Sequence, residues 1–267
     1  MPRISPLTGR RIRHLFRSGH AYDDIAALLA TVEPKGLCLD LPAGSGVNIE
    51  GIRAAGFEPV AADIFPREAA SKGVPAVLVD FTEPLPFADS TFAAVLCSEG
   101  IEHCSRQLDL LREFHRILKP GGALLITTPN ILNLRARLAW LLAGHRYFKG
   151  EPVNEATYLR GFSQEGRPYI GHVFLASYYV LRFMLRMVGF ERLEVATAKH
   201  SATALALAPL LWLPVWATTR VVLARLRRQG YGAVAAEIAR HVLSPDLLFG
   251  KKLLLLARKP GIEGGRD

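Results

Sequence analysis

The stretch GLCLDLPAGSG at residues 36–46 decides how this chain folds. Its first half is a short apolar run without alternation of polar and apolar residues, a pattern typical of a strand buried on both faces of a parallel sheet. Its second half is rich in glycine, which lets the backbone approach a ligand closely and turn sharply into a helix. The stretch therefore predicts a buried strand followed by a ligand-binding turn.

Strand and helix patterns alternate outward from this stretch. Further short apolar runs lie at 59–63, 76–80, 93–98 and 123–127, and a final pair of strands is expected at 192–197 and 252–257. The clearest helical segment is 107–119, where Leu111, Phe114 and Leu118 share one face, and 178–188 is another. This alternation predicts a doubly wound α/β sheet with ligands bound beyond the carboxyl ends of its strands.

The composition fits one large domain in a reducing compartment. The chain has 267 residues, of which 50% are hydrophobic and 21% are charged, so it can bury a substantial core. Three cysteines, Cys38, Cys97 and Cys104, are too few for a disulfide framework. The first seventeen residues are basic and are interrupted by proline and glycine, so we expect no signal peptide. These features together favour a cytoplasmic protein.

The positive charge is unevenly distributed. The net charge is +9, and five arginines precede the first acidic residue. A second cluster comprises Arg220, Arg225, Arg227 and Arg228. Such clusters suit an anionic surface, either a membrane or a nucleic acid, although a basic face that only aids solubility fits equally well.

Three successive strands are expected to end in a carboxylate, at Asp40, Asp63 and Asp80. A carboxylate at Asp63 can accept both ribose hydroxyls of an adenosine, while Asp80 can bind the adenine amino group and Phe81 can cover the base. Ile49 occupies the position where the dinucleotide fingerprint needs a third small residue, which argues against NAD or FAD. Each carboxylate alone could be a cap or turn residue, but three in succession predict a nucleoside site.

The series of motifs continues toward the carboxyl terminus with LPFADSTF at 85–92, SEGIEH at 98–103 and LKPGG at 118–122. In this order and spacing, the chain resembles the class I S-adenosylmethionine (SAM)-dependent methyltransferases, in particular the large group whose motifs read LPF…SEVLEH and LKPGG. The resemblance covers about 36–198 and the last strand. It implies a Rossmann-like, doubly wound, mostly parallel seven-stranded sheet with an antiparallel last strand.

The resemblance also divides the chain into regions. We expect a basic segment and a helix at 1–35, a methyltransferase core at 36–199 and 251–258, and an apolar and basic helical insertion at 200–250.

The resemblance implies a set of residues that bind SAM. Asp40, Gly44 and Gly46 would flank its methionine part, Asp63 would hold the ribose, Asp80 and Phe81 would hold the adenine, and Ser98 would complete the set. Pro42 departs from the family pattern, which usually has glycine there. Proline has no N–H donor and a fixed φ, so the turn can differ locally. We expect the site to survive because Gly44 and Gly46 remain.

The acceptor side is expected to perform acid–base or metal chemistry. Methyl transfer is an in-line displacement that requires alignment, and an oxygen acceptor must also lose a proton to a base or beside a metal. The candidates are Glu99, Glu102 and His103, which follow the fourth strand, and the distant His172. The catalytic expectation rests on Glu102, His103 and His172.

These four residues resemble the two glutamates and two histidines that hold a divalent metal in the ubiquinone-biosynthetic O-methyltransferases and the small-RNA 2′-O-methyltransferases. The resemblance implies Mg²⁺ or Mn²⁺, with zinc also compatible. The alternative is that the histidines line the pocket and the glutamates cap the turn, with His103 as a base or a pocket residue.

An apolar insertion lies between the two last strands. Residues 201–219 carry no charge, and Pro209 and Pro214 interrupt them. A single membrane span is topologically awkward, because the last strand must return to the sheet. An interfacial element, a lid over an apolar acceptor, a dimer contact and a buried helix pair are all compatible with the sequence. The long connection at 144–171 is a further candidate lid.

We therefore expect a methyltransferase that transfers the methyl group of SAM to a small or lipid-linked acceptor. Oxygen is the expected acceptor atom, and carbon and nitrogen are also compatible with the sequence. We also expect peripheral contact with the inner face of the membrane through residues 201–228. An RNA methyltransferase and a non-catalytic SAM-binding scaffold are the alternatives. The absence of a basic strip interleaved with aromatic residues argues against nucleic acid as a partner.

Overall fold

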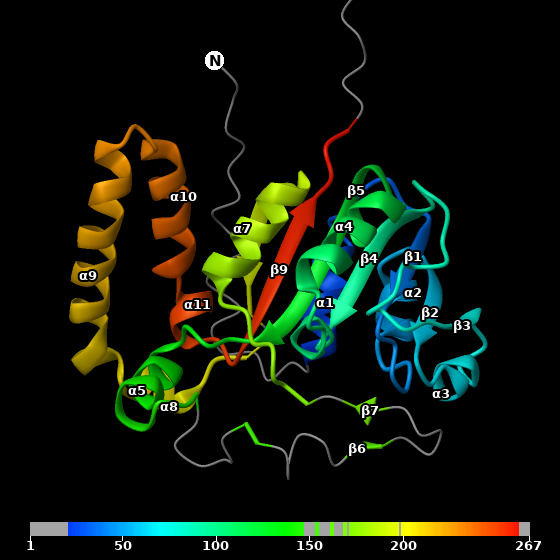
Figure 1. Ribbon diagram of the computed structural model, residues 1–267, viewed down its shortest axis with the longest axis horizontal. Helices are drawn as coiled ribbons and strands as arrows, with labels where there is room; N and C mark the ends of the chain where they lie inside the picture. Colours follow the sequence, from blue (N-terminus) through cyan, green and yellow to red (C-terminus); the bar gives the residue numbers. More distant parts are fainter. Residues whose placement is uncertain are drawn as a thin grey trace, which may run out of the picture.

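A seven-stranded sheet forms the centre of the computed structural model, which describes residues 21–146, 153–154, 161–162, 168–169, 171–197 and 199–261. Its strands lie in the order β3-β2-β1-β4-β5-β9-β8 (Figure 1). They are β1 (Leu37–Asp40), β2 (Glu58–Asp63), β3 (Ala76–Leu78), β4 (Phe92–Ser98), β5 (Leu118–Pro129), β8 (Glu191–Ala196) and β9 (Lys252–Arg258). The ladders from β3 to β5 are parallel, and β9 runs antiparallel to both of its neighbours. The predicted topology is therefore confirmed.

Helices cover both faces of this sheet because successive strand residues point to opposite faces. On one face, Leu39 and Val95 pack against α4 (Gln107–Ile117) and α7 (Tyr178–Val188). On the other face, Cys38 and Leu96 pack against α1 (Ala21–Leu29) and α2 (Ile49–Ala54). Two short helices complete this part of the fold: α3 (Arg67–Ala70) and the 3-10 turn η2 (Ile101–His103).

Several predicted boundaries differ. The strand expected at 76–80 already ends at Leu78, and the strand expected at 123–127 is the longer β5. The helix expected at 107–119 ends at Ile117, and Leu118 is already extended with φ −73° and ψ 138°. The cause is pairing with the neighbouring strand: Leu118 lies opposite Phe92 in the β4–β5 ladder. Tertiary pairing thus overrides the local helical periodicity of the last residues.

The insertion folds as α8 (Ala202–Ala206), α9 (Ala208–Arg228), α10 (Gly232–Val242) and α11 (Pro245–Phe249). The prolines do not interrupt it as expected, because Pro209 lies in the first turn of α9 and the helix continues through Pro214. A proline is tolerated in the first turn, where its missing N–H has no helical partner. None of the helices in the described residues has the length and apolar character that a bilayer span requires.

The α9–α10 pair lies at one end of the molecule and is attached through α10 (Figure 1). The Tyr178 hydroxyl on α7 lies 2.6 Å from Nδ1 of the buried His241 on α10. Glu237 of α10 also accepts hydrogen bonds from Arg182 and Arg186 of α7. These polar contacts fix α10, and α9 packs on its outer side.

The long connection is only partly described. Within it, β6 (Gly161–Phe162) and β7 (Pro168–Tyr169) form a separate antiparallel pair. The lid expected at 144–171 and the basic N-terminal residues 1–20 fall largely outside the described residues. α5 (Leu134–Ala143) precedes this connection and follows the carboxyl end of β5.

Candidate functional site

The glycine-rich turn after β1 surrounds a fully buried carboxyl group. Nδ2 of Asn48 donates to Oδ1 and Oδ2 of Asp40 at 3.3 and 3.4 Å. Burial raises the pKa of Asp40 to about 8, the Asn48 hydrogen bond opposes this shift, and the nearby Asp63 adds to it. Gly46 has φ +72°, and a Cβ there would lie 3.3 Å from the backbone of Ala69. The turn therefore needs glycine at this position, as predicted.

Asp63 joins the end of β2 to the glycine-rich turn. Its Oδ2 accepts from the Gly44 N–H at 2.8 Å, and its Oδ1 accepts from the Phe65 N–H at 2.9 Å. A carboxylate offers about four lone-pair positions, so capacity for two hydroxyl donors remains. Asp63 thus orders the turn, and its contact with a ribose stays a prediction.

Asp80 lies beyond the end of β3 and stabilises the loop that carries Phe81. Its Oδ1 accepts from the N–H and the hydroxyl of Thr82, at 2.9 and 2.6 Å. Phe81 is half-buried and lines a cavity of about 270 Å³ together with Arg106, which directly precedes α4, and Leu110 of α4. Phe81 therefore borders an open space, and its contact with adenine stays a prediction.

Pro42 is accommodated by a second departure from the family pattern. A Cβ on Gly100 would overlap Cδ of Pro42 and lie 2.9 Å from its Cγ and 3.1 Å from Sγ of Cys97. The family motif SEVLEH has valine where this chain has Gly100. The proline ring thus occupies space that the valine side chain would need. The sequence contains both departures, but only the structure shows that the two positions are in contact.

The turn after β4 begins with a constrained residue. Glu99 has a positive φ of 51°, which is uncommon for a non-glycine residue. Its N–H donates to the Thr127 carbonyl at 3.0 Å, and the Thr127 hydroxyl lies 3.1 Å from its Oε1. Its Oε2 lies 3.3 Å from Nζ of Lys252. Ser98 lies beside this turn, with Oγ 3.2 Å from Oγ1 of Thr127.

Glu102 is the buried centre of the acceptor side. It is fully buried, and its Oε2 accepts from the Thr128 hydroxyl at 3.0 Å. Its Oε1 is also buried and has no hydrogen-bond partner among the described residues. Burial raises the pKa of Glu102 to about 7, and the charge of Glu99 adds to the shift. A buried carboxyl oxygen without a partner is costly, so this atom marks a place prepared for a ligand or a proton.

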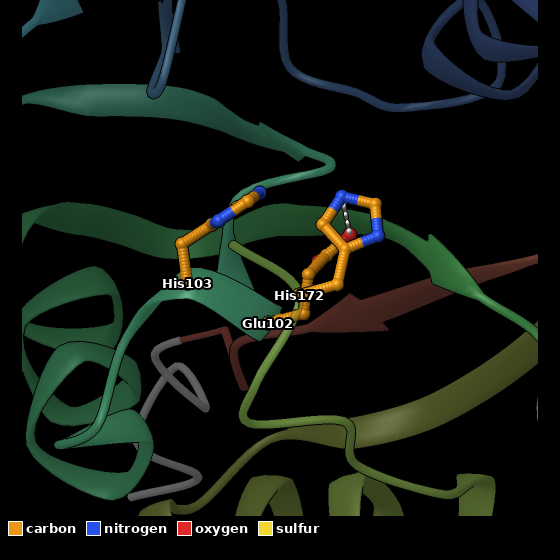
Figure 2. Close-up of side chains that lie close together, drawn as sticks. All are labelled: Glu102, His103 and His172. Atoms are coloured by element: carbon orange, nitrogen blue, oxygen red, sulfur yellow. Dashed lines mark ion pairs between the residues drawn. The ribbon is translucent and has the colours of Figure 1, made fainter. Parts of the chain in front are cut away.

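Two imidazoles flank Glu102, as Figure 2 shows. Nε2 of His172 lies 3.9 Å from Glu102 Oε1, and the ring centroids of His172 and His103 are 4.8 Å apart. Burial lowers the pKa of His172, and the neighbouring His103 and Arg146 add to this effect. Ligand atoms of these three residues lie within 4.8 Å of one another. The structure thus brings together three of the four predicted residues, while Glu99 is held by Lys252 and Thr127.

Arg146 determines which ring nitrogen of His172 carries the proton. Its guanidinium lies 3.1 Å from Nδ1 of His172. Arginine can only donate, so Nδ1 accepts and the neutral ring carries its proton on Nε2, facing Glu102. A metal ligand at Nε2 would need the opposite tautomer. Two protein cations, Arg146 and Lys252, also lie beside the two glutamates, which leaves little unmatched negative charge for a divalent metal.

Sequence reasoning did not find Arg146, Lys252 or Thr128. Thr128 could have been found, because it follows the predicted strand at 123–127. Polar residues at the ends of other predicted strands had already indicated the donor side of the site. Arg146 and Lys252 carry no local signal, since they reach the site from the end of α5 and from β9.

Comparisons with known proteins identify the family of this chain. A family model described as a methyltransferase domain matches residues 11–194. The demethylmenaquinone methyltransferase of Corynebacterium urealyticum is 42% identical over 91 residues, which are 33% of this chain and 39% of that protein. The one of Mycobacterium tuberculosis is 40% identical over 91 residues, 33% of this chain and 38% of that protein. The alignments thus span less than half of these relatives.

Solved structures show the same fold. A SAM-dependent methyltransferase from Thermotoga maritima superposes with a TM-score of 0.53 at 15% identity, covering 90% of this chain and 89% of the other. The YcgJ protein of Bacillus subtilis superposes with a TM-score of 0.51 at 16% identity, covering 91% and 99%.

Proposed function

Since the chain belongs to the methyltransferase domain family and is a SAM-dependent methyltransferase, we propose that it methylates a hydroxyl-bearing, lipid-linked acceptor at oxygen. The donor would lie over the glycine-rich turn, with Asp40, Asp63 and Asp80 along its length. The acceptor would enter from the side of η2 and α5. The observation that carries this proposal is the buried Oε1 of Glu102, which lacks a partner among the described residues and lies beside two imidazoles.

The cluster of Glu102, His103 and His172 can remove the proton of an acceptor hydroxyl. His103 takes the proton as the acceptor oxygen attacks the methyl carbon, the new C–O bond forms, and the C–S bond breaks to release the demethylated donor. Imidazole is suited to this role because its pKa lies near neutrality. The Glu102 carboxylate would stabilise the imidazolium across a short distance. His172 is less suited as a base, because Arg146 already occupies its Nδ1.

The lipid-like character of the acceptor is supported by two observations. The two relatives described above are named demethylmenaquinone methyltransferases, which suggests a quinone-type acceptor, although they align over only a third of this chain. Apolar side chains are also exposed on α5 and α9 beside the acceptor side. Peripheral contact of residues 201–228 with the inner face of the membrane, from a cytoplasmic position, belongs to the same proposal.

A divalent metal at Glu102, His103 and His172 is the second candidate. The unpartnered carboxylate oxygen favours it, and the ion would lower the pKa of an acceptor hydroxyl. The neighbouring cations and the tautomer of His172 weigh against it. The two candidates differ in one measurement. Under the acid–base mechanism a chelator leaves turnover unchanged, whereas a metal site requires loss of turnover and its recovery with Mg²⁺ or Mn²⁺.

The acceptor class is tested by product analysis. The full chain is incubated with SAM carrying a labelled methyl group and three acceptors: a hydroquinone with a prenyl tail, the same ring without the tail, and a mixed RNA. We expect label on the tailed ring as an O-methyl resonance. A C-methyl product would support the proposed acceptor class and would overturn oxygen as the methylated atom. Label on RNA alone, or on no hydroxyl-bearing ring, would overturn the proposal.

A further inference from the structure

α5 and α9 expose an apolar surface at one end of the molecule. Its members, which we call the α5–α9 edge, are Trp140, Leu141 and Leu142 of α5 and Leu210, Trp212, Leu213 and Trp216 of α9. Leu141 and Leu210 are 79% and 70% exposed. The two helices are in contact, because Leu134 of α5 packs in one cluster with Leu211 and Val215 of α9 (Figure 1). Large apolar side chains exposed in such number on two touching helices are typical of an interaction site.

All three tryptophans of the chain lie on this edge. Trp140, Trp212 and Trp216 are 47%, 46% and 36% exposed, so the core does not use them. The rings of Trp212 and Trp216 stack with their centroids 6.3 Å apart. Indole combines a large apolar body with one N–H donor, and it is enriched where a bilayer meets water. This distribution points to a membrane surface.

The charges of both helices have the sign that suits such a surface. The sequence contains no acidic residue from 195 to 236 or from 130 to 146. Arg220, Arg225, Arg227 and Arg228 are all exposed on α9, and the Arg220 guanidinium lies 5.3 Å from the centroid of the Trp216 ring. Cationic side chains beside tryptophans complement anionic headgroups. They would repel a second copy of the same surface, which argues against a symmetric dimer at this edge.

The edge also lies next to the acceptor side of the site. α5 follows the carboxyl end of β5, which carries the Thr128 bound to Glu102. Beyond the exposed Leu142, the chain reaches Arg146, whose guanidinium contacts His172. A membrane that contacts the end of α5 would therefore touch residues only a few positions along the chain from Arg146, which contacts the site.

We propose that the α5–α9 edge docks the enzyme on an anionic membrane, with the tryptophans at the headgroup level and the α9 arginines on the lipid phosphates. The acceptor side then faces the bilayer. Only this last consequence rests on the proposed lipid-linked acceptor, since docking itself follows from exposure and charge.

The test uses the full chain and vesicles of phosphatidylcholine with or without phosphatidylglycerol. Because every tryptophan lies on the edge, tryptophan emission reports docking directly. We expect a blue shift and co-sedimentation with the anionic vesicles only, both reduced by salt. Changing Leu141 and Leu142 to Glu should weaken binding by at least roughly tenfold. Changing Arg225, Arg227 and Arg228 to Gln should weaken it by roughly a hundredfold at low salt.

The matched control is Phe183→Glu, which changes a 61% exposed apolar residue on α7 and should leave vesicle binding unchanged. Equal loss in this variant would move the docking surface to α7 and overturn the proposal. Equal pelleting with both vesicle types would also overturn the proposal. A blue shift that depends on protein concentration and not on lipid would overturn it in favour of self-association. Calorimetric SAM binding in the same variants separates docking from donor binding and folding, and no acceptor is needed.

Discussion

The donor side and the acceptor side of this enzyme are built in different ways. The expected donor residues Asp40 and Asp63 end β1 and β2, and Asp80 follows β3 by two positions, so the order of the sheet brings them to one edge. The acceptor group joins Glu102 after β4 to His172, which comes from beyond α5 and lies 70 positions later. A donor that is the same throughout a family can be bound by the fold itself, whereas acceptor recognition depends on segments that vary. The two sides should therefore respond separately to mutation.

The largest expected effect is on the acceptor side. His103→Ala removes the proposed base and should lower kcat by roughly a hundred- to ten-thousandfold, while the Kd for SAM stays within about twofold. Single-turnover kinetics and calorimetry measure the two quantities. The matched control is His115→Ala, since His115 lies in the last turn of α4 and packs against Phe190. A parallel loss of SAM affinity in His103→Ala would place this ring in the donor site and remove the separation.

A smaller effect is expected on the donor side. Asp63→Ala removes the acceptor of the Gly44 and Phe65 N–H groups together with the proposed ribose contact. SAM affinity should fall by about 1.5–3 kcal/mol, which is roughly ten- to a hundredfold. Turnover at saturating SAM should change much less.

Two further variants qualify the Asp63 result. Asp63→Asn keeps one acceptor oxygen and should lie between the wild type and Asp63→Ala. Glu50→Ala, at an exposed position on α2, should bind SAM normally. Unchanged affinity in Asp63→Ala would mean that this carboxylate serves only the turn.

The same contrast explains what could be predicted from the sequence. The strands, their order and the donor edge follow from short apolar runs and the glycine-rich turn, because burial on both faces leaves a clear pattern. The cluster of Glu102, His103 and His172 was anticipated through a family resemblance, but its electrostatics were not. Arg146 and Lys252 supply the cations, and both arrive through long-range packing. The path of α9 through Pro214 was also missed, because local proline rules do not account for tertiary support.

The third prediction concerns the contact between the two sides. Pro42 belongs to the donor turn and Gly100 to the acceptor turn, and a side chain at Gly100 would overlap the proline ring. Gly100→Val should reduce the free energy of unfolding by about 1–3 kcal/mol through overpacking. Adding Pro42→Gly should recover most of this loss, and urea denaturation of the four proteins in the cycle gives the coupling free energy. Additive effects would show that the two departures are independent.

The smallest expected effect is a fraction of a proton, and it probes the donor side alone. Burial holds the pKa of Asp40 at about 8, so in the free enzyme at pH 7 this carboxyl is mostly protonated. SAM brings a sulfonium and an ammonium group, and a nearby cation favours the carboxylate, which lowers the pKa on binding. Binding at pH 7 should therefore release up to about one proton. Affinity should rise with pH and level off above the pKa of about 8, where the carboxyl of the free enzyme is already deprotonated. Calorimetry in buffers of different ionisation enthalpy counts the protons, and Asp40→Asn should abolish the buffer dependence. Proton uptake on binding would contradict this prediction. A buffer dependence that persists in Asp40→Asn but disappears in Glu102→Gln would assign the titrating group to the acceptor side and show that donor binding is electrostatically coupled to that side.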